Sequence, residues 1–426
     1  MKRVVVLIGG KDPKAGMGGG ASYFRAHARA AMQAGFEPHI FYGAPVVRVV
    51  ESEYGYIHEA QSFVARRFAK SAGIEITKCL LPWLAPRVAS EIERFLLPRR
   101  GPHLIHGFSA WAYTALLAGE RLRRAGAEAI VVGNVYTTAE NECRVKAHAM
   151  AGYASRFNRL ASRLEYAIVK RAIARCEGRF FAEARLILLN YDSVHRLFER
   201  DYGPVANVRK LPYAAETAFL EEDGGELPPA PDAIAALEPR DAPLIVSVSR
   251  HDPRKGLDTL LRALAGLRAK GVRFRACLTS GGVLIGEHRR LAMRLGIADS
   301  VAMTGWIPDP YPYLRHADIF VLPSLQEASG ALSVLEAMQA GAAIVASGID
   351  GILEDVSDGD NGLLARPGDA AALGRALERV LTDGALRARL RRRARETYVE
   401  KFSAAAFTAA MRTTYDELTT ESRQRR

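Results

Sequence analysis

Two series of alternating strands and helices, separated by a polar stretch, constrain the fold of this chain more than any other feature. The first series opens with "RVVVLIGG" (3–10), an apolar β-branched run that ends in two glycines. Such runs are typical of strands buried on both faces of a parallel sheet. The second series opens with "LIVSVSR" (244–250), after a linker rich in Pro, Gly and acidic residues at 221–243. Short strand–helix connections predict parallel sheets, so we expect an α/β protein with two Rossmann-like domains.

Length and composition narrow the class of protein. At 426 residues the chain exceeds the size at which a single core keeps growing, which agrees with two domains. The sequence contains no apolar run of membrane-spanning length, and the apolar stretch in "MKRVVVLIGG" is too short for a signal peptide. The four cysteines are scattered without a CxxC pair, which argues against a disulfide framework or a metal cluster. We therefore expect a cytoplasmic protein.

The net charge of +12 is confined to the first half of the chain. Residues 1–205 hold 30 Lys and Arg against 18 Asp and Glu, whereas residues 206–426 hold 29 of each. This asymmetry predicts either an anionic partner, such as the surface of an anionic membrane, or a contribution to solubility alone. Nucleic acid is not an expected partner, because no interleaved aromatic residues accompany the basic ones.

Ligands of such folds bind beyond the carboxyl ends of the strands, so the loops that follow strands carry the candidate residues. Residues 16–21, "GMGGGA", follow the first strand and open a helix, in a formal match to GxGxxA. They predict contact with a phosphate or another ligand at the helix N-terminus, with a merely flexible loop as the alternative. A dinucleotide is disfavoured, because the second strand ends in Tyr42-Gly43 and lacks an acid for the ribose.

Two cations follow the first strand of the second series. Arg250 ends that strand, and Lys255 begins the next helix after an Asp-Pro turn. Two cations beside a helix N-terminus suit a diphosphate, although two solvent-exposed bases are the simpler alternative. Trp306 and Ile307 follow a later strand and offer an apolar face to a flat base, with a plain core tryptophan as the alternative.

Two glutamates follow the strand at 319–322. Glu327 lies in a loop of small residues, and Glu336 lies in a helix for which we expect Ser329 as N-cap and Gly341 as C-cap. Glu336 is next to a buried stripe and lacks a helix-spaced base, which favours ribose hydroxyls as its partner. We interpret Asp358-Gly-Asp360 as a turn and expect no metal site there. The arginine run near residue 390 is expected to be a solvated face.

These segments in this order resemble the retaining glycosyltransferases of family 4, which have the GT-B fold. The matching stretches are the Gly-rich loop and, in the second half, "SVSRHDPRKGLDTLLRAL", "MTGWI", "YPYLRHADIFVLPSLQEASG", "LEAMQAGAAIVAS" and "VSDGDNGLLARPGD". The match is dense over about 240–390 and looser before it. The resemblance implies an acceptor-binding domain at 1–205, a nucleotide-sugar-binding domain at 206–395 across a cleft from it, and a C-terminal helix at 396–426 that returns to the first domain.

The resemblance also implies roles for individual residues. Arg250 and Lys255 would hold the donor diphosphate, and Glu336 would bind the ribose. Glu327 would contact the donor sugar. Gly330, with Ala331 and Leu332, would present backbone amides to the sugar and the phosphate. Gly18 and Gly19 would line the donor from the opposing domain.

The chain departs from the family pattern at two places. Eight residues separate Glu327 from Glu336, where the family has seven, so the loop between Gly330 and the helix must absorb one residue. The family's HxH-like strand end reads His106-Gly-Phe108 here, which leaves His106 as the candidate catalytic histidine. A structural hydrogen bond is the alternative for that histidine.

The resemblance implies a hexosyltransferase that retains anomeric configuration and acts without a metal or other cofactor. Its donor would be a UDP- or GDP-linked sugar, and its acceptor a hydroxyl of a glycan, a lipid-linked compound or a small molecule. The alternative is a non-catalytic sugar-nucleotide or glycan-binding protein on the same scaffold. An epimerase of the same fold is a third interpretation.

Overall fold

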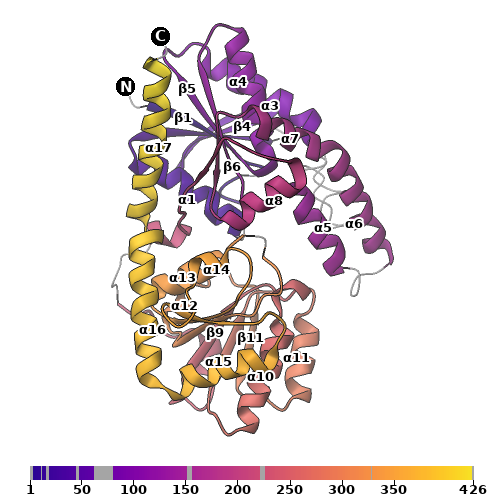
Figure 1. Ribbon diagram of the computed structural model, residues 1–426, viewed down its shortest axis with the longest axis vertical. Coiled ribbons are helices and arrows are strands. Elements are labelled where there is room, and N and C mark those ends of the chain that lie inside the picture. The colour runs from indigo at the N-terminus through magenta and orange to yellow at the C-terminus, as the bar shows by residue number, and fades with distance from the viewer. Residues whose placement is uncertain are drawn as a thin grey trace. The chain divides into compact units, whose positions relative to one another are not determined.

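The computed structural model describes residues 3–10, 12–15, 19–44, 48–61, 80–150, 156–220, 226–327 and 329–424. The chain forms two compact units (Figure 1). The first consists of Met1–Glu216 together with Ala404–Arg426, and the second of Thr217–Ser403. Over the described part of the chain, every helix is too short or too polar to cross a lipid bilayer.

The first unit is built on an eight-stranded sheet in the order β3-β4-β2-β1-β5-β6-β7-β8. Its strands are β1 (Arg3–Ile8), β2 (Phe36–Ala44), β3 (Arg48–Ser52), β4 (Gly55–Gln61), β5 (His103–Phe108), β6 (Ala129–Asn134), β7 (Leu186–Leu189) and β8 (Val208–Lys210). All neighbours pair in parallel except β3 and β4, which form an antiparallel hairpin. The parallel sheet was predicted; the hairpin was not, because β3 is largely exposed and neither of its strands has the continuous apolar run used to find the others.

Helices cover this sheet and connect its strands. They are α1 (Gly19–Gln33), α3 (Leu81–Leu96), α4 (Ala112–Arg124), α5 (Ala139–Met150), α6 (Arg156–Ile168), η2 (Val169–Ile173), α7 (Ala174–Glu183), α8 (Asp192–Tyr202) and α17 (Ala404–Gln424), with the single 3-10 turn η1 (Ser109–Trp111). A further 3-10 turn, η3 (Glu216–Phe219), lies where the chain passes from the first unit into the second. The C-terminal helix α17 packs against α1. Its Phe407 and Tyr415 are fully buried, and the Thr408 hydroxyl lies 2.9 Å from the Gln33 side-chain oxygen. The last helix is therefore an integral part of the first unit.

The second unit contains a six-stranded, all-parallel sheet in the order β11-β10-β9-β12-β13-β14. Its strands are β9 (Leu244–Val248), β10 (Arg275–Thr279), β11 (Val301–Gly305), β12 (Ile319–Leu322), β13 (Ala343–Ser347) and β14 (Gly362–Ala365). Its helices are α9 (Asp232–Ala235), η4 (Pro253–Lys255), α10 (Leu257–Ala269), α11 (Ile285–Arg294), α12 (Tyr311–Arg315), α13 (Leu332–Ala340), α14 (Ile352–Asp355), α15 (Ala370–Thr382), α16 (Gly384–Thr397) and η5 (Tyr398–Phe402).

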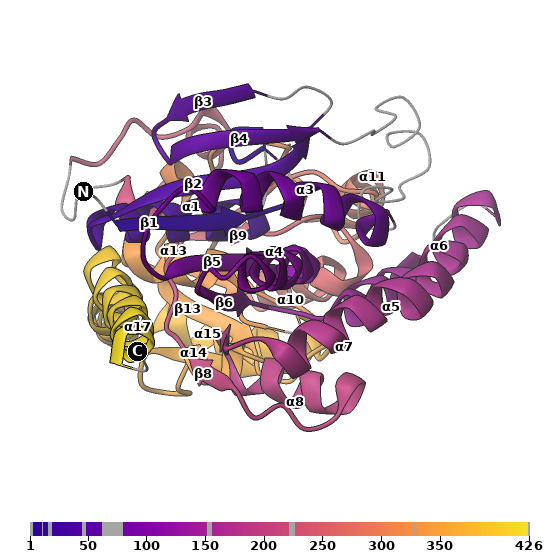
Figure 2. The ribbon, with the colours of Figure 1, turned by 90° about the horizontal axis from the view of Figure 1, so that it is seen from above.

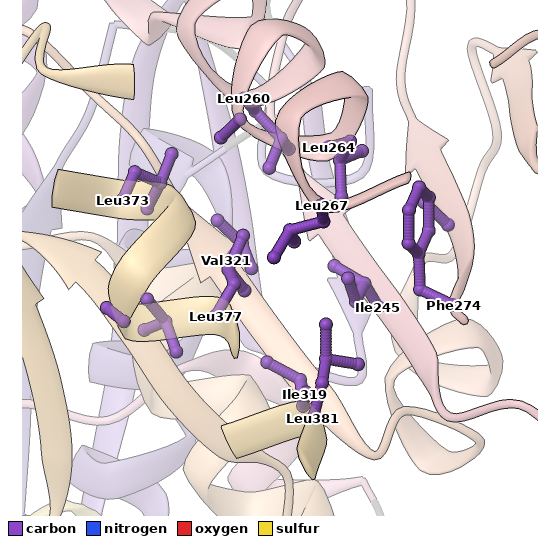
Figure 3. Close-up of a cluster of buried hydrophobic side chains, with 14 of the residues drawn as sticks. Ile245, Leu260, Leu264, Leu267, Phe274, Ile319, Val321, Leu373, Leu377 and Leu381 are labelled. Atoms are coloured by element: carbon purple, nitrogen blue, oxygen red, sulfur yellow. The ribbon is translucent and has the colours of Figure 1, made fainter. Parts of the chain in front are cut away.

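An apolar cluster between one face of this sheet and the helices α10 and α15 forms the core of the second unit (Figure 3). Strand residues such as Ile245 and Val321 meet Leu264 of α10 and Leu377 of α15, and all four are inaccessible to solvent. Burying each such side chain contributes about 1.5–3 kcal/mol. The Asp369 carboxylate caps α15 by accepting a hydrogen bond from the backbone of its first turn. The core and the caps fix the strand ends from which the candidate site is built.

The arginine run of α16 is more than the solvated face that we predicted. Arg391 donates to the carbonyl of Gly341 at 2.7 Å, and Arg395 donates to the carbonyl of Gln339 at 2.7 Å. Both carbonyls belong to the C-terminal end of α13, where cations are favourable because of the helix dipole. The two arginines therefore stabilise the C-terminal end of α13.

Candidate functional site

The strand order of the second unit reverses between β9 and β12. From β9 the chain proceeds through β10 to β11 on one side of the sheet, and from β12 it proceeds through β13 to β14 on the other. The chain therefore leaves β9 and β12 in opposite directions, and the crevice at the carboxyl ends of these two strands is where α/β folds bind ligands. This arrangement brings the cations that follow β9 to the glutamate that follows β12.

Lys255 and Glu327 form an ion pair in this crevice. The Lys255 Nζ lies 2.5 Å from the Glu327 Oε1, and the two side chains are only 16% and 9% exposed. The Ser324 hydroxyl donates to the same oxygen at 2.5 Å, and the Glu327 backbone N–H donates to the Asp350 carboxylate at 2.9 Å. Poor solvation makes the charge–charge attraction far stronger here than at an exposed site. The structure thus confines Glu327 to one position, facing the lysine.

The loop from β9 to α10 is rigidly folded against the loop after β12. Asp252 caps the turn by accepting a hydrogen bond from the Arg254 backbone N–H at 3.0 Å, and the Arg254 carbonyl accepts one from the Leu325 N–H at 2.7 Å. Gly256 has a φ of +59°, and a Cβ on it would lie 2.1 Å from the Pro323 carbonyl oxygen. Only glycine allows the two loops to approach this closely.

Arg250 differs from Lys255 in its freedom to move. Its side chain is 67% exposed, and its guanidinium lies 3.7 Å from the Asp252 carboxylate. An exposed pair at this distance is weak. Arg250 can therefore turn towards a ligand with little loss of interaction energy, whereas the ion pair with Glu327 fixes the position of Lys255.

His251, next to Arg250, anchors the loop and was not found from the sequence. Its N–H donates to the Gly281 carbonyl, and its carbonyl accepts from the Leu284 N–H, both at 2.9 Å. Its Nδ1 lies 2.8 Å from the Nδ1 of the buried His288. Burial, followed by the neighbouring His288, lowers the pKa of His251 to about 4, so the ring is neutral at pH 7. Two histidines from different strand–helix units give no local signal in the sequence.

The N-cap of the helix that carries Glu336 lies two residues later than expected. The N-cap of α13 is Ala331, with no side-chain hydrogen bond to it, while the Ser329 hydroxyl contacts the Gly330 carbonyl at 3.3 Å. The prediction of Ser329 as N-cap was wrong because its short side chain is used within the loop. The N–H groups at the start of α13, which follow Gly330, thus lack a side-chain cap in the described structure, an arrangement suited to an anion.

Glu336 lies in the second turn of α13 and is half-buried. It already has an interaction within the described part of the chain, so its burial does not by itself require a ligand. The helix ends at Gly341, whose φ of +76° confirms the predicted left-handed C-cap. Leu332, the first residue of α13, is half-buried.

Trp306 projects from the loop after β11, beside the strand-end glycines of β10. Its side chain is 60% exposed, which excludes the core-tryptophan alternative. Its backbone lies in contact range of Gly281, and the following Ile307 is half-buried. An exposed indole at the carboxyl edge of the sheet offers a flat apolar face to a ligand.

His106 occupies a different setting from the one expected of a catalytic residue. It lies within β5, is fully buried, and its Nδ1 is 2.7 Å from the Tyr415 hydroxyl of α17. Its ring stacks on Phe108 with centroids 4.5 Å apart, and burial holds its pKa well below the usual range. The geometry supports the structural alternative for His106, because side chains of its own unit cover the ring completely.

Of the two glycines expected to line the donor, Gly18 lies outside the described residues. Gly19 is the first residue of α1 and is exposed. In the second unit, Asp358 accepts a hydrogen bond from the Leu364 N–H at 2.8 Å, and Asp360 pairs with Arg393 at 3.0 Å. The two aspartates are thus used in a turn and an ion pair.

Residues 232–397 match the family model described as "Glycosyl transferases group 1". This segment of the chain belongs to that family. The crevice residues from Arg250 to Glu336 all fall inside it, whereas the Gly-rich loop and His106 lie outside.

Relatives of known name agree with this assignment. The chain is 37% identical over 172 residues to the lipopolysaccharide core biosynthesis glycosyltransferase LpsE of Rhizobium meliloti, covering 40% of this chain and 49% of the relative. It is 32% identical over 198 residues to a GDP-mannose-dependent α-(1-6)-phosphatidylinositol monomannoside mannosyltransferase of Mycolicibacterium smegmatis, covering 44% and 50%. The chain thus spans about half the length of the curated relatives that it matches.

Solved structures extend the likeness of fold over both units of the chain. Sucrose-phosphate synthase of Thermosynechococcus elongatus superimposes with a TM-score of 0.69 at 21% identity, over 99% of this chain and all of the other. WaaG, a glycosyltransferase involved in lipopolysaccharide biosynthesis, does so with a TM-score of 0.65 at 17% identity, over 97% and 99%. The predicted GT-B fold is confirmed.

Proposed function

We propose that the chain is a glycosyltransferase that transfers a hexose from a nucleoside-diphosphate sugar to a hydroxyl acceptor with retention of configuration. The observation that supports this best is the crevice between β9 and β12. It combines a fixed cation, a weakly paired cation and a helix N-terminus without a side-chain cap with a partly buried carboxylate. These groups complement a diphosphate joined to a sugar.

In this proposal the protein stabilises the charge that develops on the leaving group. Breaking the bond between the sugar and the diphosphate moves negative charge onto the diphosphate. Arg250, Lys255 and the amides that follow Gly330 would stabilise that charge most in the transition state, which is what lowers the barrier. These groups can act without a metal ion or another cofactor, so we propose a metal-independent reaction.

The remaining parts of the donor would be held by neighbouring loops. Glu336 would accept hydrogen bonds from the ribose hydroxyls, Glu327 would contact the sugar, and Trp306 with Ile307 would face the base. For retention we propose front-face substitution, in which the leaving phosphate accepts the acceptor's proton.

The names of the relatives indicate only the chemical class of the donor and of the acceptor. One is a lipopolysaccharide core enzyme and another is GDP-mannose-dependent with a phosphatidylinositol-linked acceptor. We propose a UDP- or GDP-linked hexose as donor, and a glycan, lipid-linked or small-molecule hydroxyl as acceptor. We also propose that the enzyme is cytoplasmic and that its basic first unit makes peripheral contact with an anionic membrane.

A thermal-shift screen of UDP-, GDP-, ADP- and dTDP-sugars tests donor binding, because a ligand stabilises the state that it binds. We expect one nucleotide to raise Tm, and Glu336→Gln to abolish that rise without changing the Tm of the free protein by more than a few degrees. An unchanged rise would refute the ribose assignment. NMR of the product's anomeric centre tests retention.

A second candidate, a non-catalytic nucleotide-sugar-binding protein, is favoured by two observations. His106 is buried against Tyr415, and Glu327 is held by Lys255. Tight UDP or GDP binding without donor hydrolysis or transfer across a broad acceptor panel would favour this candidate over the transferase.

A further inference from the structure

Arg250 and His251 are neighbours in the loop after β9, but one side chain is exposed and the other is buried. The Arg250 side chain is 67% exposed, whereas His251 is completely inaccessible to solvent. The Arg250 carbonyl accepts a hydrogen bond from the Asp252 N–H at 2.8 Å, so the backbone bends tightly around His251. The position of the His251 ring therefore fixes the stretch of backbone from which the Arg250 side chain departs.

The loop after β10 is shaped to receive His251. Gly282 has a φ of +155°, and a Cβ on it would lie 2.4 Å from the His251 carbonyl oxygen. Ser280 has a φ of +84°, a conformation that a residue other than glycine adopts only where its surroundings impose it. The backbone of His251 bonds to this loop at both its N–H and its carbonyl. The second loop thus makes a close seat for residue 251.

The ring of His251 is held by a single hydrogen bond to His288. The two Nδ1 atoms lie 2.8 Å apart, so one must carry the proton and the other must accept it. The Nε2 of His251 is buried and has no hydrogen-bond partner within the described part of the chain. A proton on that atom would be an unsatisfied donor, which is costly. The proton therefore belongs on the Nδ1 of His251, which donates it to the Nδ1 of His288.

His288 is a firm anchor for this hydrogen bond. It lies in α11, which packs against α10 and β11 in the second unit (Figures 1 and 2). His288 is 4% exposed, and its backbone N–H donates to the Leu284 carbonyl at 2.8 Å. Burial lowers the pKa of both histidines, so both rings are neutral at pH 7 and the pair keeps one donor and one acceptor. The pair thus connects the loop after β9 to a helix of the core.

We infer that His251 is a positioning residue, which through its hydrogen bond to His288 fixes the backbone that presents Arg250 to the donor diphosphate. The inference rests on the proposed function, because it requires Arg250 to bind the diphosphate. A histidine that served only the stability of the fold would affect ligand binding in the same way whether or not Arg250 is present. A positioning residue acts through Arg250, so its effect on binding disappears when the guanidinium is removed.

A double-mutant cycle tests the inference, with titration calorimetry of UDP and of GDP binding to the full chain. Arg250→Gln should weaken binding about 10- to 100-fold, because it removes charge-assisted hydrogen bonds to the diphosphate. His251→Leu and His288→Leu should each weaken it about tenfold, within the range of coupling between residues of one network. Neither should weaken it further in the Arg250→Gln background. His251→Asn, whose amide can donate in place of Nδ1, should restore most of the affinity.

His316 provides a matched control in the same unit. It is half-buried, its Nε2 lies 2.8 Å from the Pro228 carbonyl oxygen, and it precedes β12 at the amino edge of the sheet. His316→Leu should bind nucleotide as the parent does. Circular dichroism checks that each variant is folded, and His288→Leu provides the same test if His251→Leu does not fold.

The possible failures of the inference and of the proposed function can be told apart. If the parent binds UDP or GDP and the His251 and His288 variants bind as tightly, the inference is overturned while the proposed function stands. The same holds if these variants weaken binding as strongly in the Arg250→Gln background as in the parent, because the histidines would then be merely structural. If the parent binds neither nucleotide, the proposed function fails and the inference fails with it.

Discussion

Replacing Gly256 by alanine tests how the two loops of the crevice are held together. Gly256 joins the turn that carries Lys255 to helix α10, with a φ of +59°. An added Cβ would lie 2.1 Å from the Pro323 carbonyl oxygen, whereas real Cβ contacts begin at about 3.0 Å. The carbonyl must therefore retreat by about 0.9 Å. It cannot do so freely, because Pro323 follows directly on β12, whose residues are completely buried.

The cost of Gly256→Ala has two parts. A non-glycine residue in the left-handed region costs about 1 kcal/mol. Forcing an extra methyl group into a packed site adds about 1–3 kcal/mol. Together these lower the free energy of unfolding of the second unit by about 2–4 kcal/mol. Gly271 provides the matched control, since its φ is +76° and nothing lies within 4 Å of its added Cβ. Gly271→Ala should cost only the first part.

Differential scanning calorimetry measures both variants. For a domain of this size, 1 kcal/mol shifts Tm by about 2–4 °C, so Gly271→Ala should lower Tm by that amount. Gly256→Ala should lower it two to four times as far, and should also weaken nucleotide binding by displacing Lys255. Equal shifts in the two variants would show that the close approach to Pro323 is not a constraint, and the reasoning about the loops would be refuted.

Four further outcomes follow from the described contacts. Burial lowers the pKa of His27 and of His251 to about 4, compared with about 6.5 in the unfolded chain. The stability that these neutral histidines contribute is therefore complete above pH 6.5 and falls as pH decreases towards 4. Urea unfolding at pH 5 should show a loss of about 2 kcal/mol per histidine, and a gain in stability would contradict the assignment. Asp369→Ala should cost about 1 kcal/mol by uncapping α15, with nucleotide affinity unchanged by calorimetry. Tyr415→Phe removes the buried hydroxyl that contacts His106, and should cost about 1–3 kcal/mol in urea unfolding. Glu327→Gln should tighten binding of a nucleoside diphosphate while abolishing transfer, and weaker binding in titration calorimetry would count against the proposed pairing.

The sequence predicted the parts of the fold that depend on neighbouring residues. Buried parallel strands can be recognised as continuous apolar runs in the sequence. The end of α13 could be predicted at Gly341 because a left-handed C-cap favours glycine. The placement of Lys255 and Glu327 at one sheet edge followed from the rule for strand ends, although 72 residues separate them. Local pattern and topology together were sufficient for this part of the site.

The contacts that could not be predicted from the sequence involve partners far apart along the chain. His106 contacts the hydroxyl of Tyr415, 309 residues away, so no local pattern distinguishes a structural from a catalytic role for it. His251 pairs with His288 in the same way. Ser329 failed as an N-cap because a loop of small residues offers its hydroxyl a nearer acceptor. The direction of a polar side chain is decided by the competition among such acceptors.

The ion pair between Lys255 and Glu327 changes how the two proposed roles relate. While Glu327 compensates the charge of Lys255, the lysine offers a diphosphate less attraction than an unpaired cation would. A diphosphate that takes Lys255 must displace the carboxylate, which keeps only the Ser324 hydroxyl and is then free to accept a hydroxyl of the attached sugar. Leaving that carboxylate buried without a new partner is costly. A bare nucleoside diphosphate bears this cost, whereas a nucleotide sugar supplies the missing hydrogen bond. The pair would thus favour the intact donor over the spent product, and its removal in Glu327→Gln would abolish that preference.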